Sequence, residues 1–157
     1  MKPDDWSNIA YLLAAIWFAV SGAYVPAAGL AILAWGSFMG HKYGGKWWGA
    51  DWAGMFIAFG SIIFHNLSIP WMFPFLVGSF WFIKSEHYVD EYLFIGISWA
   101  IAYATALYVG VPAIPVLAVF ATALAIRQWG HDREFQLTHS IWHFLTALGF
   151  VMLTLTA

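Results

Sequence analysis

The sequence predicts an all-α protein, an integral membrane bundle of seven transmembrane helices, from its composition, its apolar runs and the distribution of its charges. Of the 157 residues, 62% are hydrophobic and 9% are charged, and the mean hydropathy is +0.74. A typical water-soluble domain has about 25% charged residues. Aromatic residues make up 20% of the chain, which suits the belts that Trp and Tyr form at membrane interfaces.

The expected helices are the apolar runs between charged clusters and Gly/Pro turns. They cover about 8–24, 27–41, 51–67, 70–84, 92–108, 112–127 and 137–155. Uncharged turns, YVPAAG, HNLSIPW and YVGVPAIP, follow the first, third and fifth runs, and charged segments separate the others. Most runs are at the short end of the roughly 17–25 residues of a spanning helix. The sequence shows no second domain or internal repeat, so residues 1–157 are expected to form one domain.

All six basic and eight acidic residues fall in four segments that seven spans would place on one side of the membrane. The positive-inside rule then predicts that this side, with the N-terminus, is cytoplasmic and that the C-terminus lies opposite. The charged residues of the four segments are Lys2, Asp4 and Asp5; Lys42, Lys46 and Asp51; Lys84, Glu86, Asp90 and Glu91; and Arg127, Asp132, Arg133 and Glu134.

Two histidines, His139 and His143, are spaced i, i+4 near the start of the last run. Helical spacing places them on one face, about 6 Å apart along the axis. They could be polar residues hydrogen-bonded to neighbouring helices, but ionisable groups within a membrane are costly and usually functional. Taken alone, the pair is as consistent with packing as with a metal site.

A third candidate ligand, His41, ends the second run on the same side, one turn after Ser37, and Asp51 opens the third run. The chain has no cysteine, so any metal must be held by His, Asp or Glu. Three imidazoles with an open fourth position suit a catalytic zinc. Asp51 could transfer protons and Ser37 could hydrogen-bond a water or an oxyanion. A helix-terminal role for Asp51 and a backbone-bonded hydroxyl for Ser37 are the structural alternatives.

The remaining histidines are expected to be structural or solvated. Ser61 and His65 repeat the Ser-x-x-x-His spacing, but His65 is fourteen residues from Asp51, about 21 Å along a helix. His87 and His131 lie in charged loops.

The ordered set Ser37-x-x-x-His41, Asp51 and His139-x-x-x-His143 resembles the CREST superfamily of seven-helix membrane proteins. This group contains alkaline ceramidases, progestin/adipoQ-type receptors, GPI-remodelling proteins and myomaker-like proteins, and THSIWHFLTALG is itself similar to the family's last helix. The resemblance implies a zinc ion held by the three histidines, with Asp51 and Ser37 supporting its bound water, and hydrolysis of a lipid amide or ester. Alkaline ceramidases also have a calcium site with a Glu in the first helix, and calcium is not expected here because the first run has no carboxylate.

Three functions follow as hypotheses. The leading one is a zinc-dependent intramembrane hydrolase with a membrane lipid as substrate. The second is a non-enzymatic membrane protein, stabilised by zinc, that senses a lipid or binds a partner. The third is a haem-binding subunit with His41 and either His139 or His143 as axial ligands. Nothing in the sequence indicates a nucleic-acid partner.

Overall fold

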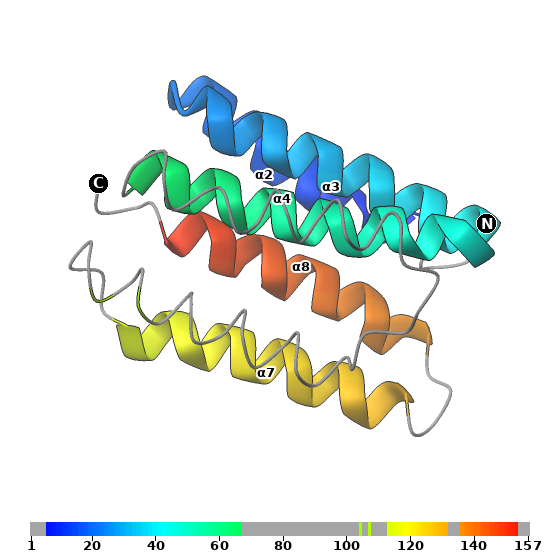
Figure 1. The fold of residues 1–157 in the computed structure, drawn as a ribbon. Coiled ribbons are helices and arrows are strands. Elements are labelled where there is room, and N and C mark those ends of the chain that lie inside the picture. The colour runs from blue at the N-terminus through cyan, green and yellow to red at the C-terminus, as the bar shows by residue number, and fades with distance from the viewer. Residues whose placement is uncertain (1–5, 67–103, 105–106, 108–112, 132–135, 154–157) are drawn as a thin grey trace.

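The structure is a computed structural model that describes residues 6–66, 104, 107, 113–131 and 136–153 (Figure 1). Within these ranges the chain is helical, which confirms the predicted all-α class. The helices are α2 (Ile9–Val20), α3 (Tyr24–Tyr43), α4 (Trp48–Asn66), α7 (Ala113–His131) and α8 (Gln136–Met152), with one 3₁₀ turn at Gly45–Trp47. The helix expected at 70–84, and all of the one expected at 92–108 except residues 104 and 107, lie outside the described residues.

The prediction of an integral, multi-pass membrane protein is wrong. In the part of the chain that the structure describes, no helix combines the length and the apolar character needed to cross a membrane. The 12-residue helix α2, for example, is about 18 Å long, against about 30 Å for the hydrocarbon core of a bilayer. The sequence-based reasoning counted Gly, Trp, Ser and His as parts of apolar runs, although they contribute little hydropathy. The predicted orientation, with the N-terminus and the metal site on the cytoplasmic side, depended on transmembrane spans and therefore does not hold.

The helix ends follow the glycines more closely than the apolar runs. Gly22 has a φ of 82°, and α2 ends just before it, at Val20, rather than at residue 24. The next helix, α3, starts earlier than predicted because Pro26 is accommodated in its first turn. It continues to Tyr43, where Gly44, with a φ of 61°, ends it. This extra length places His41 in the last turn of α3.

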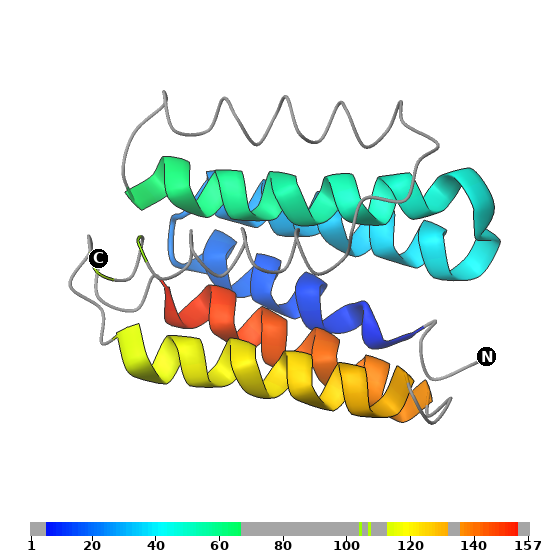
Figure 2. The same cartoon turned by 60° about the horizontal axis from the view of Figure 1, so that its bottom comes forward.

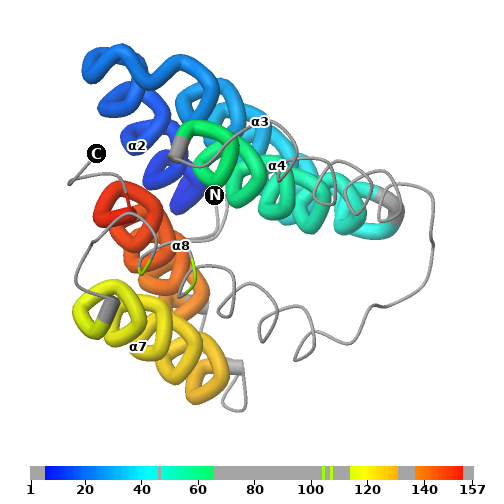
Figure 3. The backbone as a smooth tube through the Cα atoms, turned by 60° about the vertical axis from the view of Figure 1, so that its left-hand side comes forward, coloured from blue at the N-terminus to red at the C-terminus, as the bar shows by residue number. Residues whose placement is uncertain are grey.

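The helices pack as neighbours in a bundle, with α8 between α7 and α2, and with α2 against α3 (Figures 1 and 3). The turned ribbon shows α3 lying along α4 (Figure 2). Helices α3 and α7 end, and α4 and α8 begin, at the same end of the bundle, on the right in Figure 1. This arrangement brings residues from distant parts of the sequence to one place.

Glycines allow α3 and α4 to approach closely beside this end. A Cβ atom on Gly40 would lie 3.1 Å from the Asp51 Cβ, and one on Gly54 would lie 2.8 Å from the Leu33 Cα. A Cβ on Gly36 would overlap the backbone carbonyl of Ala50. The lack of side chains at these positions lets the first turn of α4, with Asp51, rest on α3 one turn from His41.

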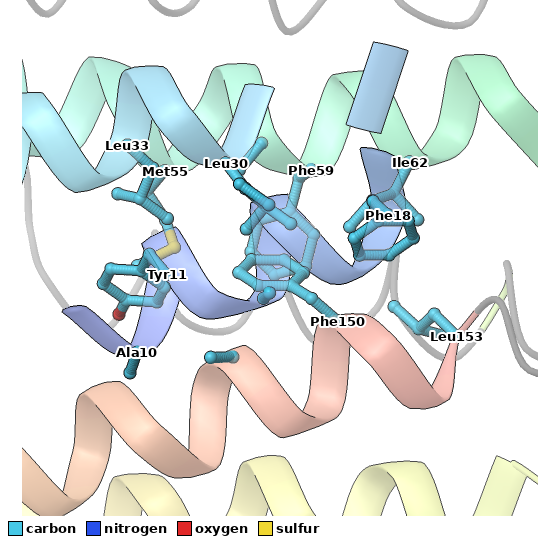
Figure 4. Close-up of a cluster of buried hydrophobic side chains, with 14 of the residues drawn as sticks. Ala10, Tyr11, Phe18, Leu30, Leu33, Met55, Phe59, Ile62, Phe150 and Leu153 are labelled. Carbon is cyan, nitrogen blue, oxygen red and sulfur yellow. The ribbon is translucent and has the colours of Figure 1, made fainter. Parts of the chain in front are cut away.

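A cluster of buried apolar side chains fills the centre of the bundle, as Figure 4 shows. The rings of Phe59 on α4 and Phe150 on α8 lie 4.7 Å apart, centroid to centroid, and Phe18 of α2 is completely buried. Tyr11 closes one end of this cluster, and its hydroxyl points away from the apolar side chains toward α8 (Figure 4). The hydroxyl therefore marks the boundary between the apolar core and a polar region.

Candidate metal centre

The polar region contains the three histidines that the sequence singled out. His41 comes from the last turn of α3, and His139 and His143 come from the first two turns of α8. The nitrogen atoms that each could offer as ligands all lie within 4.8 Å of one another. The three side chains that were predicted to hold a metal are thus brought together, and they could hold a metal ion.

The imidazoles are in direct contact. Nε2 of His139 lies 3.1 Å from Nε2 of His41, so one of the two nitrogens donates a hydrogen bond to the other. The ring centroids are 4.6 Å apart for His41 and His139, 4.7 Å for His139 and His143, and 5.3 Å for His41 and His143. Ligand nitrogens around a tetrahedral zinc are roughly 3.3 Å apart. The His41–His139 pair is already close to that spacing.

His143 supplies the strongest sign that the cluster fits a metal. Its side chain is completely buried, and its Nε2 atom has no hydrogen-bond partner in the described structure. A buried polar atom left without a partner costs about 1–3 kcal/mol. A metal ion shared with His41 and His139 would satisfy this lone pair, so the donor set and its geometry fit an imidazole-bound ion.

The other nitrogen of His143 is already engaged. Ser7 Oγ lies 2.8 Å from His143 Nδ1, and both residues are fully buried. When Nε2 acts as a ligand, Nδ1 carries the proton and donates it to the serine hydroxyl. The ring of Tyr11 lies 5.1 Å from the same imidazole. Sequence reasoning missed both residues, because they lie more than 130 positions from His143.

The environment keeps His139 and His143 neutral, which is the form that binds metals. Burial, together with the positive charges that His41 and Arg127 can carry, lowers the pKa of His139 to about 3. Burial also lowers the pKa of His143 well below its usual value, with contributions from His139, His41 and Arg127. No proton has to be displaced from either ring at pH 7 before a metal binds.

Asp51 lies in the first turn of α4, as predicted, but it is not one of the clustered ligands. Burial raises the pKa of its carboxyl group to about 6, while the Ser37 hydroxyl and the charge of Arg127 act in the opposite direction. The hydroxyl of Ser37 is fully buried beside the carboxylate and does not make a hydrogen bond of good geometry. Ser37 and Asp51 therefore form a polar pair next to His41.

Arg127 is a component of this region that the sequence analysis did not connect with the histidines. It was placed at the end of the run 112–127 and counted in a charged segment, but α7 continues to His131 and carries Arg127 into the bundle. Its guanidinium lies 5.0 Å from the ring of Trp142, which is 5.4 Å from the ring of His139. Burial lowers the pKa of Arg127, and the charges of Asp51 and Tyr11 raise it. The segment AIRQWGH has no proline to end the helix, and this signal could have extended the predicted run.

The other predicted features lie apart from the cluster. His65 is exposed in the last turn of α4, and Ser61 donates a hydrogen bond to the carbonyl of Ala58 in its own helix. Both therefore have the structural or solvated surroundings expected of them. His87 and the side chain of His131 lie outside the described residues.

Comparison with known proteins adds no relative. No family model, no curated protein and no solved structure matches the chain. The resemblance to the CREST superfamily stays a prediction from the motif residues, and the function has to be argued from the site.

Proposed function

We propose that the protein is a zinc-dependent hydrolase that cleaves an amide or ester bond of a lipid. The observation that carries the proposal is the cluster of three imidazoles, in which the buried Nε2 atom of His143 has no hydrogen-bond partner among the described residues, beside the carboxyl group of Asp51. Three histidine ligands and an open position are the ligand set of catalytic zinc sites. When bound, zinc would polarise the substrate carbonyl and activate a water molecule.

The side chains around the cluster are suited to moving the protons of such a reaction. At pH 7 Asp51 is mainly a carboxylate, because its pKa of about 6 lies below the ambient pH. A base with a pKa near the working pH can accept the proton of an attacking water and then deliver it to the leaving group. Ser37 stabilises the carboxylate, and Arg127 supplies a positive charge that offsets negative charge developing on the substrate.

Support for a lipid substrate comes from the motif resemblance and from the apolar side chains around the site. Trp6, Trp48 and Leu137 are each about half exposed at this end of the bundle. The ring of Trp48 lies 5.1 Å from that of His41, and Trp6 packs 6.3 Å from Phe144. An acyl chain placed on these side chains would bring its carbonyl group toward the histidines.

The alternatives differ in what they require of the cluster. A non-enzymatic protein could use the metal to join α3 to α8, and Asp51 would then have no chemical role. A haem held between His41 and His139 is disfavoured, because the 3.1 Å between their Nε2 atoms leaves no space for a porphyrin plane.

The test combines metal content with hydrolysis of N-acyl and O-acyl lipid substrates. We expect about one zinc per chain in the wild type and in the matched control His65→Ala, and loss of zinc in His143→Ala. Asp51→Asn should keep its zinc and lose about 100-fold or more in hydrolysis. Zinc binding without hydrolysis in the wild type would favour the non-enzymatic alternative. Full activity in Asp51→Asn would refute the role given to the carboxylate, and absence of zinc from the wild type would refute the whole proposal.

A further inference from the structure

The residues that lead into α2 make a buried contact with the candidate metal centre that the hydrolytic chemistry does not use. Ser7 Oγ lies 2.8 Å from Nδ1 of His143, across 136 positions of sequence. One helical turn later, the ring of Tyr11 lies 5.1 Å from the same imidazole. Ser7, Tyr11 and His143 each have 0% of their surface exposed. The same short segment thus contacts the ring of His143 twice, away from solvent.

The contact has a defined chemical consequence for a metal ligand. An imidazole that binds a metal through one nitrogen almost always donates its other N–H to a fixed acceptor, which sets its tautomer and ring orientation. Ser7 is that acceptor for His143, since Nδ1 faces its hydroxyl while Nε2 has no hydrogen-bond partner in the described residues. Removing such an acceptor typically weakens metal binding 10- to 100-fold.

The remaining contacts of His143 show why this hydrogen bond matters for orientation. The ring of Trp142 lies 5.3 Å from it and the ring of His139 lies 4.7 Å from it, both from α8 itself. Aromatic contacts of this kind restrict the position of the ring but do not distinguish its two nitrogens. The hydrogen bond to Ser7 does distinguish them, because only Nδ1 faces the hydroxyl.

We propose that Ser7 is a positioning residue for the metal site, so that metal binding at His143 and docking of residues 6–11 on α8 stabilise each other. The inference rests on the metal binding in the proposed function but not on hydrolysis. Because both events require the same orientation of His143, each favours the other by the same factor. Residues 6–11 are then held more firmly against α8 when metal is bound than when it is absent.

The first test measures the zinc affinity of the purified full chain by competition with a chelator at pH 7. Ser7→Ala should bind zinc about 10- to 100-fold more weakly than the wild type, and Ser7→Thr, which keeps the hydroxyl, should recover most of the affinity. Ser21→Ala is the matched control, because Ser21 is an exposed serine at the other end of α2, and its hydroxyl donates a hydrogen bond to the carbonyl of Trp17 in its own helix. It should bind zinc as the wild type does.

The second test needs no substitution at Ser7 and so does not depend on how that variant folds. The amides of Tyr11 and Leu12 bond the carbonyl of Asn8 at the start of α2. In the wild type, zinc should slow hydrogen exchange of these amides about tenfold, by the reciprocity of the coupling. The amide of Ser21, which bonds the Trp17 carbonyl at the far end of α2, should change little.

The outcomes separate the two proposals. Zinc binding that is equal in Ser7→Ala and wild type, or wild-type exchange at residues 11–12 that zinc leaves unchanged, overturns the coupling and leaves the proposed hydrolase intact. A wild type that binds no zinc overturns both. If metal binding and docking of residues 6–11 are coupled but the protein has no hydrolytic activity, the positioning role of Ser7 is supported and the proposed hydrolase is refuted.

Discussion

Acidification of the metal-free protein from pH 7 to pH 5 should lower its free energy of unfolding by about 3 kcal/mol through three buried groups of the metal centre. His139 and His143 have pKa values far below that of an unfolded histidine, about 6.5. Below pH 6.5 the unfolded chain therefore binds protons that the folded chain does not. Stability is fully present above that pH and is lost as the pH falls, by about 2 kcal/mol for each histidine between pH 7 and pH 5.

Asp51 acts in the opposite direction. Its pKa is raised from 3.8 to about 6 in the folded protein, so between these values the folded chain binds a proton that the unfolded chain does not. Protonation of Asp51 therefore stabilises the folded protein by about 1 kcal/mol on going from pH 7 to pH 5. The two histidines together lower the free energy of unfolding by about 4 kcal/mol, and the difference is the net loss of about 3 kcal/mol.

The measurement is urea unfolding with EDTA at pH 7 and pH 5, followed by Trp fluorescence, in the wild type and in His143→Gln. Because the variant lacks one of the two histidines, its loss of unfolding free energy between pH 7 and pH 5 should be about 2 kcal/mol smaller than that of the wild type. This difference isolates one group from every other titrating residue of the chain. The variant His65→Gln controls for the loss of a histidine outside the cluster. Equal losses in His143→Gln and the wild type would refute the claim that His143 is held neutral in the folded protein.

Three further outcomes test the packing and the metal site. Zinc at 100 times its dissociation constant should raise the free energy of unfolding of the wild type by about 2.7 kcal/mol. If zinc raised the melting temperature of His41→Gln as much as that of the wild type, His41 would not be a ligand. Gly130→Ala should destabilise the protein by about 1–3 kcal/mol in urea unfolding, because a Cβ there overlaps the side chain of Thr138. If Gly130 instead lay on an open helix face, the same change would stabilise the protein by about 1 kcal/mol, and this result would contradict the packing. Ser140→Ala should be neutral or stabilising in the same assay, since its buried Oγ has no hydrogen-bond partner in the described structure. A loss above about 1 kcal/mol would contradict that.

The approximate positions of the described helices could be predicted from the apolar runs, because a long apolar run bounded by charged residues or Gly/Pro turns favours a buried helix in any setting. Their ends could not. The positive φ of Gly22 and Gly44 sets the ends of α2 and α3, and it depends on how the turns pack. The extension of α7 past Arg127 depends on the buried site that receives the charge. The membrane prediction failed because overall composition does not report how apolar each helix is: α3, α4 and α7 have 20, 19 and 19 residues, but none is apolar enough to cross a membrane.

The metal centre was predictable only where its spacing is local. The i, i+4 pair of His139 and His143 follows from helical geometry alone, and His41 was chosen for its place at the end of an apolar run. No such rule leads to Ser7, which reaches His143 only through the packing of α2 on α8. The contacts of Trp142 with Arg127 and His139 could not be predicted either, because an aromatic residue in an apolar helix usually only packs.

The way the site is divided along the chain has a consequence for how it binds a metal. Helix α8 alone supplies two ligands, but the third, His41, is 98 positions from His139 and is carried by α3. The acceptor that fixes His143 comes from a third segment, before α2. A peptide of α8 would therefore offer two mobile imidazoles, whereas the folded chain offers three in contact, with Ser7 facing Nδ1 of His143. Much of the metal affinity should thus come from the packing of the folded chain, and any substitution that loosens α2 from α8 should weaken binding without touching a ligand.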